Sequence, residues 1–166
     1  MTAETPGVGS PETAAARAPV PAPGQNFGWL LENFRQTVPG VRHTLAVSSD
    51  GLLMAVSAGL DRTSGDQLAA VVAGLSSLTR GAARHLAHGE VRQCVLELDT
   101  GFLFLMSISD GAVLAVDADA EGDPGLIGYE MALLARRAQG VLTPALISEL
   151  RDQLPTDGAT RLQSVG

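Results

Sequence analysis

The histidines His85 and His88 have the spacing best suited to metal chemistry, because side chains three positions apart share one face of a helix. The sequence supplies no recognisable third and fourth ligand around them. A cation near a helix C-terminus is also favoured by the helix dipole, which accounts for both histidines without a metal. We therefore predict no metal site here, and we interpret the isolated His43 as a structural residue of a strand.

An acidic segment at residues 117–122, Asp-Ala-Asp-Ala-Glu-Gly, is the second candidate for chemistry. It carries carboxylates at positions one, three and five and glycine at position six, as an EF-hand calcium loop does. Position twelve, where that loop has a bidentate glutamate, is Gly128, and an expected strand rather than a helix precedes the segment. We interpret the segment as a solvated acidic turn whose charges could meet a basic partner surface.

Signatures of catalysis are missing from the sequence. It contains no G-x-x-x-x-G-K-[ST] phosphate loop, no G-x-G-x-x-G turn and no G-x-S-x-G elbow. Cys94 is the only cysteine, so it forms no intrachain disulfide and belongs to no cysteine-rich metal site. We predict a protein that is not an enzyme and needs no cofactor, and the single cysteine fits a reducing compartment.

The composition favours a single domain with a proper core, since 45% of the 166 residues are hydrophobic. A net charge of -7 disfavours nucleic acid and anionic membranes as partners. The N-terminus lacks the basic start and apolar run of a secretory signal, and the most apolar stretch, residues 102–108, is too short to cross a bilayer as a helix. We therefore expect a soluble, cytoplasmic chain without membrane insertion.

The first elements of the expected fold follow from composition and periodicity. Residues 1–25, rich in proline and alanine, are predicted to be a disordered tail, and residues 155–166 a second one. A helix is expected from Asn26 until Pro39 and the glycine after it end the run. Two alternating strands then form a hairpin around Asp50 and its following glycine, which supplies the backbone angles of a tight turn.

The long helix after residue 63 is the most informative element. Ser64 and Gln67 have capping-box spacing, so Thr63 or Ser64 is expected to cap it. The helix has almost no charge before Arg80, and Gly74 in its middle costs about 1 kcal/mol relative to alanine. An alanine-rich surface helix would also be uncharged, but the glycine favours a partner helix packed on this one. The small side chains crowd one part of its surface, and the large apolar residues of its other face are Leu68, Val71, Val72, Leu75, Leu78 and Leu86.

The rest of the chain predicts a meander and a broken helix. Strands near residues 91–98, 102–109 and 112–117 are joined by short turns, and the middle strand is apolar on both faces, as inside a sheet. A last helix begins near Pro124, breaks at Gly140, and restarts after that break.

The order helix, two strands, long helix, three strands, helix is the arrangement of the roadblock (dynein light-chain) family. The local sequence resembles the roadblock proteins of bacterial conservon operons over residues 26–154, which we predict to be one roadblock domain. The implied fold is an α+β, roadblock/profilin-like sandwich with a five-stranded antiparallel sheet in the order α-β-β-α-β-β-β-α. The stretches that carry the resemblance are Asn26-Phe-Gly-Trp29-Leu-Leu31, Val38-Pro-Gly-Val41, Ser49-Asp-Gly-Leu52, Gly59-Leu-Asp61, Asp66-Gln-Leu68-Ala69 and Tyr129-Glu-Met131.

The resemblance implies a non-enzymatic homodimer that scaffolds or regulates a Ras-like small GTPase in bacterial signalling, with a sensor-kinase-like protein as a further partner. It also implies that the second helices of two copies pack together and that their third strands pair. A strand with only Arg92 and Glu97 as charges is a poorly protected edge, which agrees with this pairing. The dimer interface predicted on this basis consists of Leu68, Val72, Leu75, Ser76, Thr79, Val91, Gln93 and Val95.

Two other classes of function remain as alternatives. A ligand-sensing domain of the PAS, GAF or profilin-like type also sets helices against an antiparallel sheet, but the sequence offers few polar residues in core positions to line a pocket. An enzyme of unrecognised type would need a constellation of activated groups, and none emerges from the sequence.

Overall fold

The computed structural model describes residues 23–152, so the predicted tail at residues 155–166 and all but the end of the predicted tail at residues 1–25 lie outside the described part. The first helix begins at Pro23, three residues before the predicted start. The helices and strands, in chain order, are α1 (Pro23–Thr37), β1 (Val41–Ser48), β2 (Leu53–Val56), α2 (Arg62–Leu86), β3 (Cys94–Leu98), β4 (Gly101–Ser109), β5 (Ala112–Asp119), α3 (Pro124–Gln139) and α4 (Pro144–Asp152).

The predicted α+β fold class is confirmed: the strands form one five-stranded antiparallel sheet in the order β2-β1-β5-β4-β3. β4 lies inside this sheet, paired with β5 on one side and with β3 on the other, as its apolar faces predict. The last helix of the expected order is two helices, α3 and α4, separated near Gly140.

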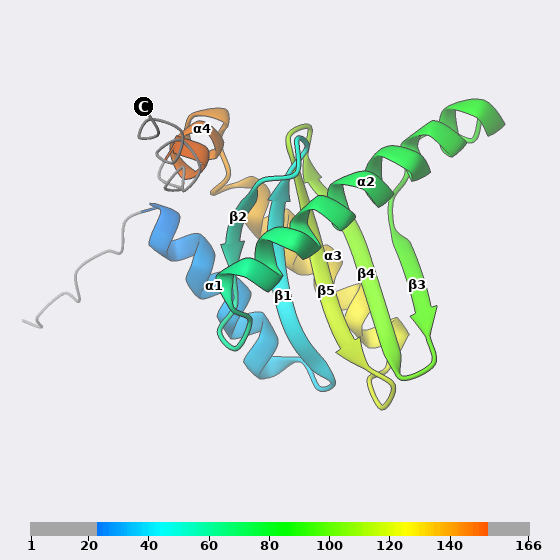
Figure 1. Ribbon diagram of the computed structural model, residues 1–166, viewed down its shortest axis with the longest axis horizontal. Coiled ribbons are helices and arrows are strands. Elements are labelled where there is room, and N and C mark those ends of the chain that lie inside the picture. The colour runs from blue at the N-terminus through cyan, green and yellow to red at the C-terminus, as the bar shows by residue number, and fades with distance from the viewer. Residues whose placement is uncertain (1–22, 153–166) are drawn as a thin grey trace, which may run out of the picture.

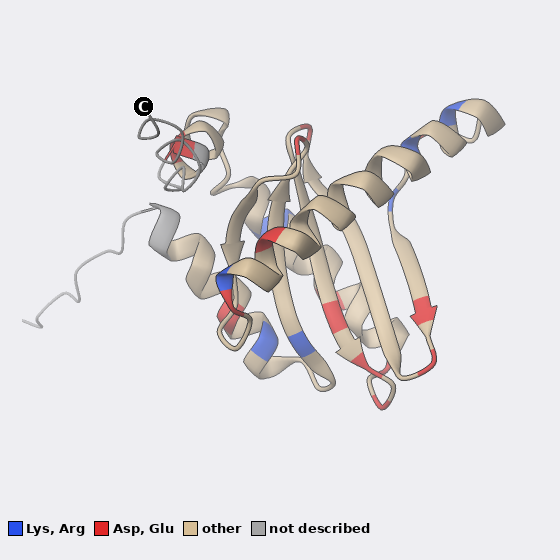
Figure 2. Ribbon diagram, viewed as in Figure 1, with Lys and Arg blue, Asp and Glu red and all other residues tan. Residues whose placement is uncertain are grey.

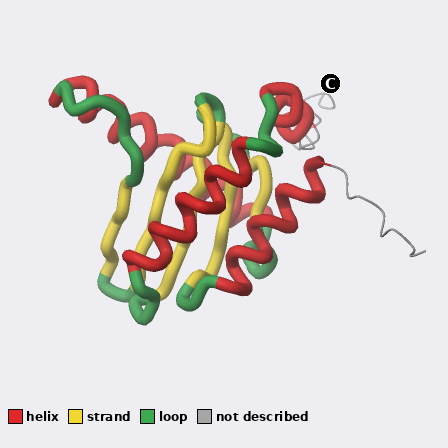
Figure 3. Tube along the Cα trace, turned by 180° about the vertical axis from the view of Figure 1, so that it is seen from behind, coloured by secondary structure: helices red, strands yellow, loops and turns green. Residues whose placement is uncertain are grey.

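The sheet separates two hydrophobic cores of unequal size. On one face, α1, α3 and α4 cover a large core that contains Phe27, Phe104 and Met131. On the other face lies α2 alone, over a smaller core that joins Val72 of this helix to Leu45 and other residues of the sheet. Figure 1 shows α2 in front of the sheet, and Figure 3, seen from behind, shows the helices of the opposite face.

The N-terminus of α2 differs from the capping prediction. Asp61 is the N-cap residue, and its carboxylate accepts a hydrogen bond from the backbone N–H of Ser64 at 3.0 Å. The prediction that Thr63 or Ser64 caps the helix is therefore wrong by two or three positions, because aspartate three residues before Ser64 supplies the oxygen. The Ser64 hydroxyl instead donates to the same carboxylate at 2.6 Å.

The predicted turn at Asp50 and Gly51 is present. Gly51 has a φ of +88°, which a residue with a side chain rarely adopts. The Ser48 N–H donates to the Leu52 carbonyl at 2.9 Å and closes the β1–β2 hairpin.

Within residues 23–152, the structure contains no helix long and apolar enough to cross a membrane. The same part of the chain has no group of three histidine, cysteine, aspartate or glutamate side chains placed to hold a metal ion.

Candidate protein-protein interface

The face of α2 that contacts the sheet is built from small residues. Gly65, Ala69, Val72 and Ser76 are the buried residues of this helix. The approach is close: a β-carbon added at Gly65 would lie 2.9 Å from Cδ2 of Leu53. Small side chains let the helix axis come near the sheet, so the helix needs few large residues on this face.

Because small residues occupy the side of α2 that faces the sheet, several large apolar residues of this helix lie on its solvent-exposed side. Val71 is 52% exposed, Leu78 is 73% exposed and Leu86 is 60% exposed, while Leu68 and Leu75 are partly buried at the edge of the smaller core. From Leu68 to Leu78 the spacing alternates between three and four, which is typical of a helix that packs on another helix. We call these residues the α2 stripe: Leu68, Val71, Leu75, Leu78 and Leu86.

This arrangement corrects the predicted interface at two positions. Val72 is fully buried and Ser76 nearly so, both against the chain's own sheet, and they are therefore unavailable to a second copy. The sequence pattern placed them wrongly because it assigned the large residues to one face without showing which face the sheet covers. Thr79 is partly buried, and its hydroxyl donates to the carbonyl of Leu75 at 3.0 Å.

The C-terminal part of α2 extends past the sheet. Figure 1 shows its last turns projecting beyond β3, and the residues from 84 to 90 are all exposed. The helix is uncharged from Gln67 to Thr79, and Figure 2 shows its ribbon continuously tan along the middle. A solvated helix normally carries charged side chains there, so the exposed apolar length is a surface suited to a partner.

β3 is the edge strand of the sheet next to this projecting helix. It pairs with β4 on one side, from Cys94 opposite Leu105 to Leu98 opposite Gly101, and the sheet order places no strand on its other side. Val95 is 47% exposed on this edge. An edge of this kind, with unpaired backbone groups and few charges, is open to pairing with another strand.

The predicted strand over residues 91–98 is three residues too long at its start. β3 begins at Cys94, and Val91 and Gln93 belong to the connection from α2. This connection runs from the end of α2, which projects beyond the sheet, to the start of β3. Its residues pair with β4 only from Cys94 onward. The Gln93 carboxamide lies over Gly128 of α3, where an added β-carbon would meet Nε2 at 3.0 Å.

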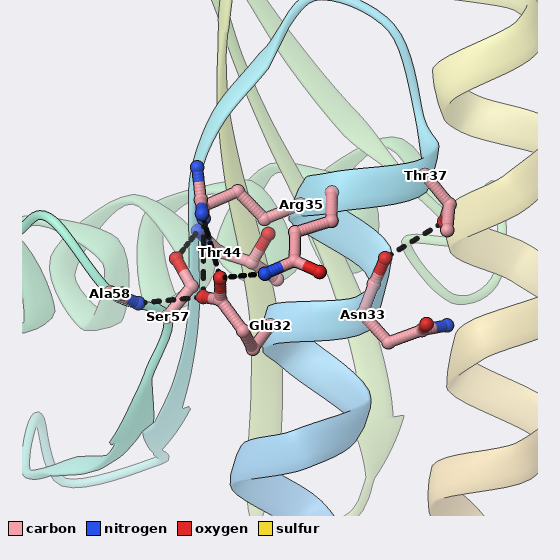
Figure 4. A network of polar contacts seen from close by, with 8 residues as sticks. Glu32, Asn33, Arg35, Thr37, Thr44, Ser57 and Ala58 are labelled. Carbon is pink, nitrogen blue, oxygen red and sulfur yellow. Dashed lines mark hydrogen bonds and ion pairs between the residues drawn. The ribbon is translucent and has the colours of Figure 1, made fainter.

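A polar cluster on the opposite face holds α1 to the sheet. The Glu32 carboxylate accepts hydrogen bonds from Arg35 at 2.6 Å, from Gln36 at 2.7 Å and from the Ala58 N–H at 2.8 Å (Figure 4). The bond from Arg35 is the main cause that lowers the pKa of Glu32 to about 2, and the Ala58 N–H adds to it. A carboxylate with so low a pKa is a poor base, so the cluster is a structural clamp rather than a catalytic site.

The other candidate residues for chemistry lie apart from one another. His85 and His88 are exposed near the free end of α2, which agrees with the absence of a metal cluster in the described residues. In the acidic segment, Asp117 lies 3.9 Å from Arg42, measured between carboxylate and guanidinium. Asp123, which the sequence interpretation did not single out, caps α3 through hydrogen bonds from the backbone N–H groups of the next turn.

A five-stranded sheet with one long helix on one face and several helices on the other defines a roadblock/profilin-like sandwich. The family model of the Roadblock/LC7 domain matches residues 27–118, and the chain belongs to this family. No curated protein sequence matches the chain. The roadblock fold is in general regulatory rather than catalytic.

Solved structures agree with this assignment. A Roadblock/LC7 domain from Streptomyces avermitilis is 40% identical, with 68% of this chain and 94% of that chain covered and a TM-score of 0.65. MglB from Myxococcus xanthus is 16% identical, with 70% and 94% covered and a TM-score of 0.65. A profilin from Schizosaccharomyces pombe is 15% identical, with 70% and 99% covered and a TM-score of 0.54. The last two show the fold alone.

Proposed function

We propose that this protein is a non-enzymatic, homodimeric adaptor or regulator of a Ras-like small GTPase in a bacterial, conservon-type signalling system of the cytoplasm. The observation that carries the proposal is the apolar α2 stripe together with the unpaired edge of β3. Both are surfaces that a second copy of the same chain would cover, and Figure 1 shows α2 crossing one face of the sheet until its last turns pass beyond β3.

The proposed interface keeps most of the predicted residues and adds those that the structure exposes. A second α2 would pack on the stripe, and the second β3 would pair with the first to extend two sheets into one. The residues of this interface are Leu68, Val71, Leu75, Leu78, Thr79, Leu86, Val91, Gln93 and Val95.

Symmetry restricts how two β3 strands can pair. Residues that oppose each other in antiparallel strands point to the same face, so around a two-fold axis one residue must oppose its own copy. With Val95 on the axis, two exposed apolar side chains meet, and the Gln93 amide faces the Glu97 carboxylate of the second copy. With Cys94 on the axis, Val91 would face that carboxylate instead. We therefore propose the register centred on Val95.

Disulfide trapping tests this register. In a Cys94→Ser background, Val95→Cys would form an intermolecular disulfide under mild oxidation, because directly opposed residues lie about 4.5–5.5 Å apart between Cα atoms. The native Cys94 would oppose Leu96 of the second copy, and its own copy would lie out of bridging range. Efficient crosslinking of the unmodified chain together with none from the Val95→Cys variant would overturn the register.

The GTPase part of the proposal is supported by the family, since roadblock proteins as a class scaffold or regulate Ras-like GTPases. Among the solved structures with this fold is one described as MglB with a tetrameric arrangement, which is consistent with an oligomeric role. A sensor-kinase-like protein is the further partner that the conservon resemblance suggests.

Size exclusion with light scattering tests the dimer and the GTPase together. The full chain would elute as a dimer and would co-elute with the Ras-like GTPase encoded beside it, more strongly in either its GTP-bound or its GDP-bound state. A dimer that does not co-elute with the GTPase in either nucleotide state would contradict the adaptor role. A stable monomer that also ignores it would favour the ligand-sensing alternative.

A further inference from the structure

A hollow of about 940 Å³ lies under the end of α2. Its walls come from four segments: the last turns of α2, residues 88–92, residues 106–110 of β4 and its turn, and the C-terminal half of α3. Val91 is the one lining residue that also belongs to the proposed dimer interface. Its size falls within the range of sites that bind ligands or peptide side chains.

One wall of the hollow is an open strand edge. The pairing of β3 with β4 ends where Cys94 opposes Leu105, but β4 continues to Ser109. Residues 106–109 therefore pair with β5 on one side and have no strand on the side of the hollow. Backbone N–H and C=O groups on such an edge are available to an incoming extended chain.

The hollow also concentrates positive charge in an acidic protein. Arg80, Arg84, Arg92 and Arg136 line it, with two carboxylates, those of Glu90 and Asp110, among the lining residues. Figure 2 shows basic residues on the end of α2 and on the segment before β3. Among residues 23–152, none of these four arginines has a carboxylate oxygen within 4.0 Å, whereas Arg35, Arg42 and Arg62 each do.

Two further features suit a peptide rather than a bare ion. Met106 and Ala132 contribute apolar surface to the lining, on which every second side chain of an extended peptide could pack. The Ser109 hydroxyl also lines the hollow and is buried without a hydrogen-bond partner within the described chain. A buried hydroxyl in that condition is a favourable place for an incoming donor or acceptor.

We propose that the hollow binds an extended acidic peptide segment of a protein partner. The segment adds as a short strand to residues 106–109 of β4, and its carboxylates pair with Arg80, Arg84, Arg92 and Arg136. Guanidinium groups match carboxylates in geometry and give strong charge-assisted hydrogen bonds. This inference goes beyond the proposed function and does not depend on dimerisation or on a GTPase.

Fluorescence anisotropy with the full chain tests the site, using a fluorescein-labelled peptide of four Glu-Val repeats. We expect binding that weakens as salt rises, and a loss of about tenfold or more in affinity for Arg84→Glu and for Arg136→Glu. Arg62→Glu, at the other end of α2, is the matched control and should bind as the unmodified chain does. Equal affinity for all three variants would overturn the proposal.

Two additional probes separate strand addition from simple charge attraction. The same peptide with alternate backbone nitrogens methylated cannot pair along a strand edge and should bind about tenfold more weakly. If it binds equally well, strand addition is wrong. Inorganic phosphate should compete no better than sodium chloride of equal ionic strength, and specific displacement by phosphate would instead define a small-anion site.

Light scattering on the arginine variants keeps this result separate from the proposed function. Arg136 lies on α3, outside the proposed dimer interface, so Arg136→Glu should lose the peptide while it keeps the oligomeric state of the unmodified chain. Loss of peptide binding only in variants that also change oligomeric state would count against a site within one protomer.

Discussion

The two faces of the sheet differ in how completely the chain covers its own apolar surface. On the face of α1, α3 and α4, large residues such as Leu31 and Phe104 are fully buried, while Trp29 and Tyr129 of the covering helices stay exposed. On the face of α2, small residues contact the sheet while Val71 and Leu78 remain exposed. The first face buries a large core within the protomer, and we propose that the second is completed when another surface covers the α2 stripe.

The largest expected effect is on the free energy of unfolding, and it appears when the same leucine-to-alanine substitution is made on each face of the sheet. Leu31→Ala removes a fully buried side chain and should lower the free energy of unfolding by about 2–5 kcal/mol. Leu78→Ala removes an exposed one and should change the stability of an isolated protomer by less than about 0.5 kcal/mol. Urea denaturation at several protein concentrations measures both effects. Dimerisation adds stability that rises with protein concentration, and Leu78→Ala should reduce only this added stability. Equal losses at all concentrations would contradict the difference between the faces.

A second pair of variants sharpens the comparison at the level of assembly. Gly74 and Gly28 both lie inside helices, and an added β-carbon at either would meet no atom within 4 Å. Glutamate should therefore fit at both positions in one protomer and raise helix propensity at both. Gly74→Glu should nevertheless split the dimer, because it places a charge in the α2 packing surface, and Gly28→Glu should not.

Analytical ultracentrifugation measures this difference directly. We expect the dissociation constant of the dimer to rise by about 100-fold or more for Gly74→Glu, with an unchanged circular dichroism spectrum. A Gly74→Glu protein that remains dimeric would overturn the assignment of α2 to the interface.

The smallest expected effect is on thermal stability and comes from the Glu32 clamp, which lies on the face of the sheet that α1, α3 and α4 cover. Glu32 has its pKa lowered from 4.5 to about 2, so the charged form is favoured in the folded state. Its contribution to stability is complete above about pH 4.5 and is lost as the pH falls toward 2. Glu32→Gln should lower the midpoint of thermal unfolding by a few degrees at neutral pH, and the difference should shrink through that window. Glu121→Gln in the exposed acidic segment at residues 117–122 is the control, and a similar pH-dependent loss there would contradict the role of the clamp.

The sequence predicted the order of elements and the place of β4 inside the sheet, because periodicity and turn residues are local signals. It failed on the orientation of α2, since a pattern of large and small residues does not say which face the sheet occupies. Contact between Gly65 and Leu53 decides that question, and it arises only in the folded chain. The start of β3 was wrong for a related reason: the alternation of Val91 and Gln93 favours a strand, but the end of α2 holds that segment away from β4.

The dimer interface stays a prediction, and the proposed surface keeps its two elements, α2 and β3. Leu68, Leu75 and Val95 remain in the proposed surface, whereas Val72 and Ser76 moved into the protomer's core. The arginine-lined hollow was not predicted at all. Its residues come from the end of α2 and the connection after it, from β4 and its turn, and from α3, and no local pattern shows that these parts of the chain meet.

The projecting end of α2 has a consequence for the life of a single copy in the cell. Its last turns have no sheet beneath them, and Arg84 there is an exposed cleavage position for a trypsin-like protease. If a second copy shields these turns, an unpaired chain is degraded faster than a paired one. Degradation of unpaired chains would then limit the cellular concentration of this protein to the chains that are bound to a partner.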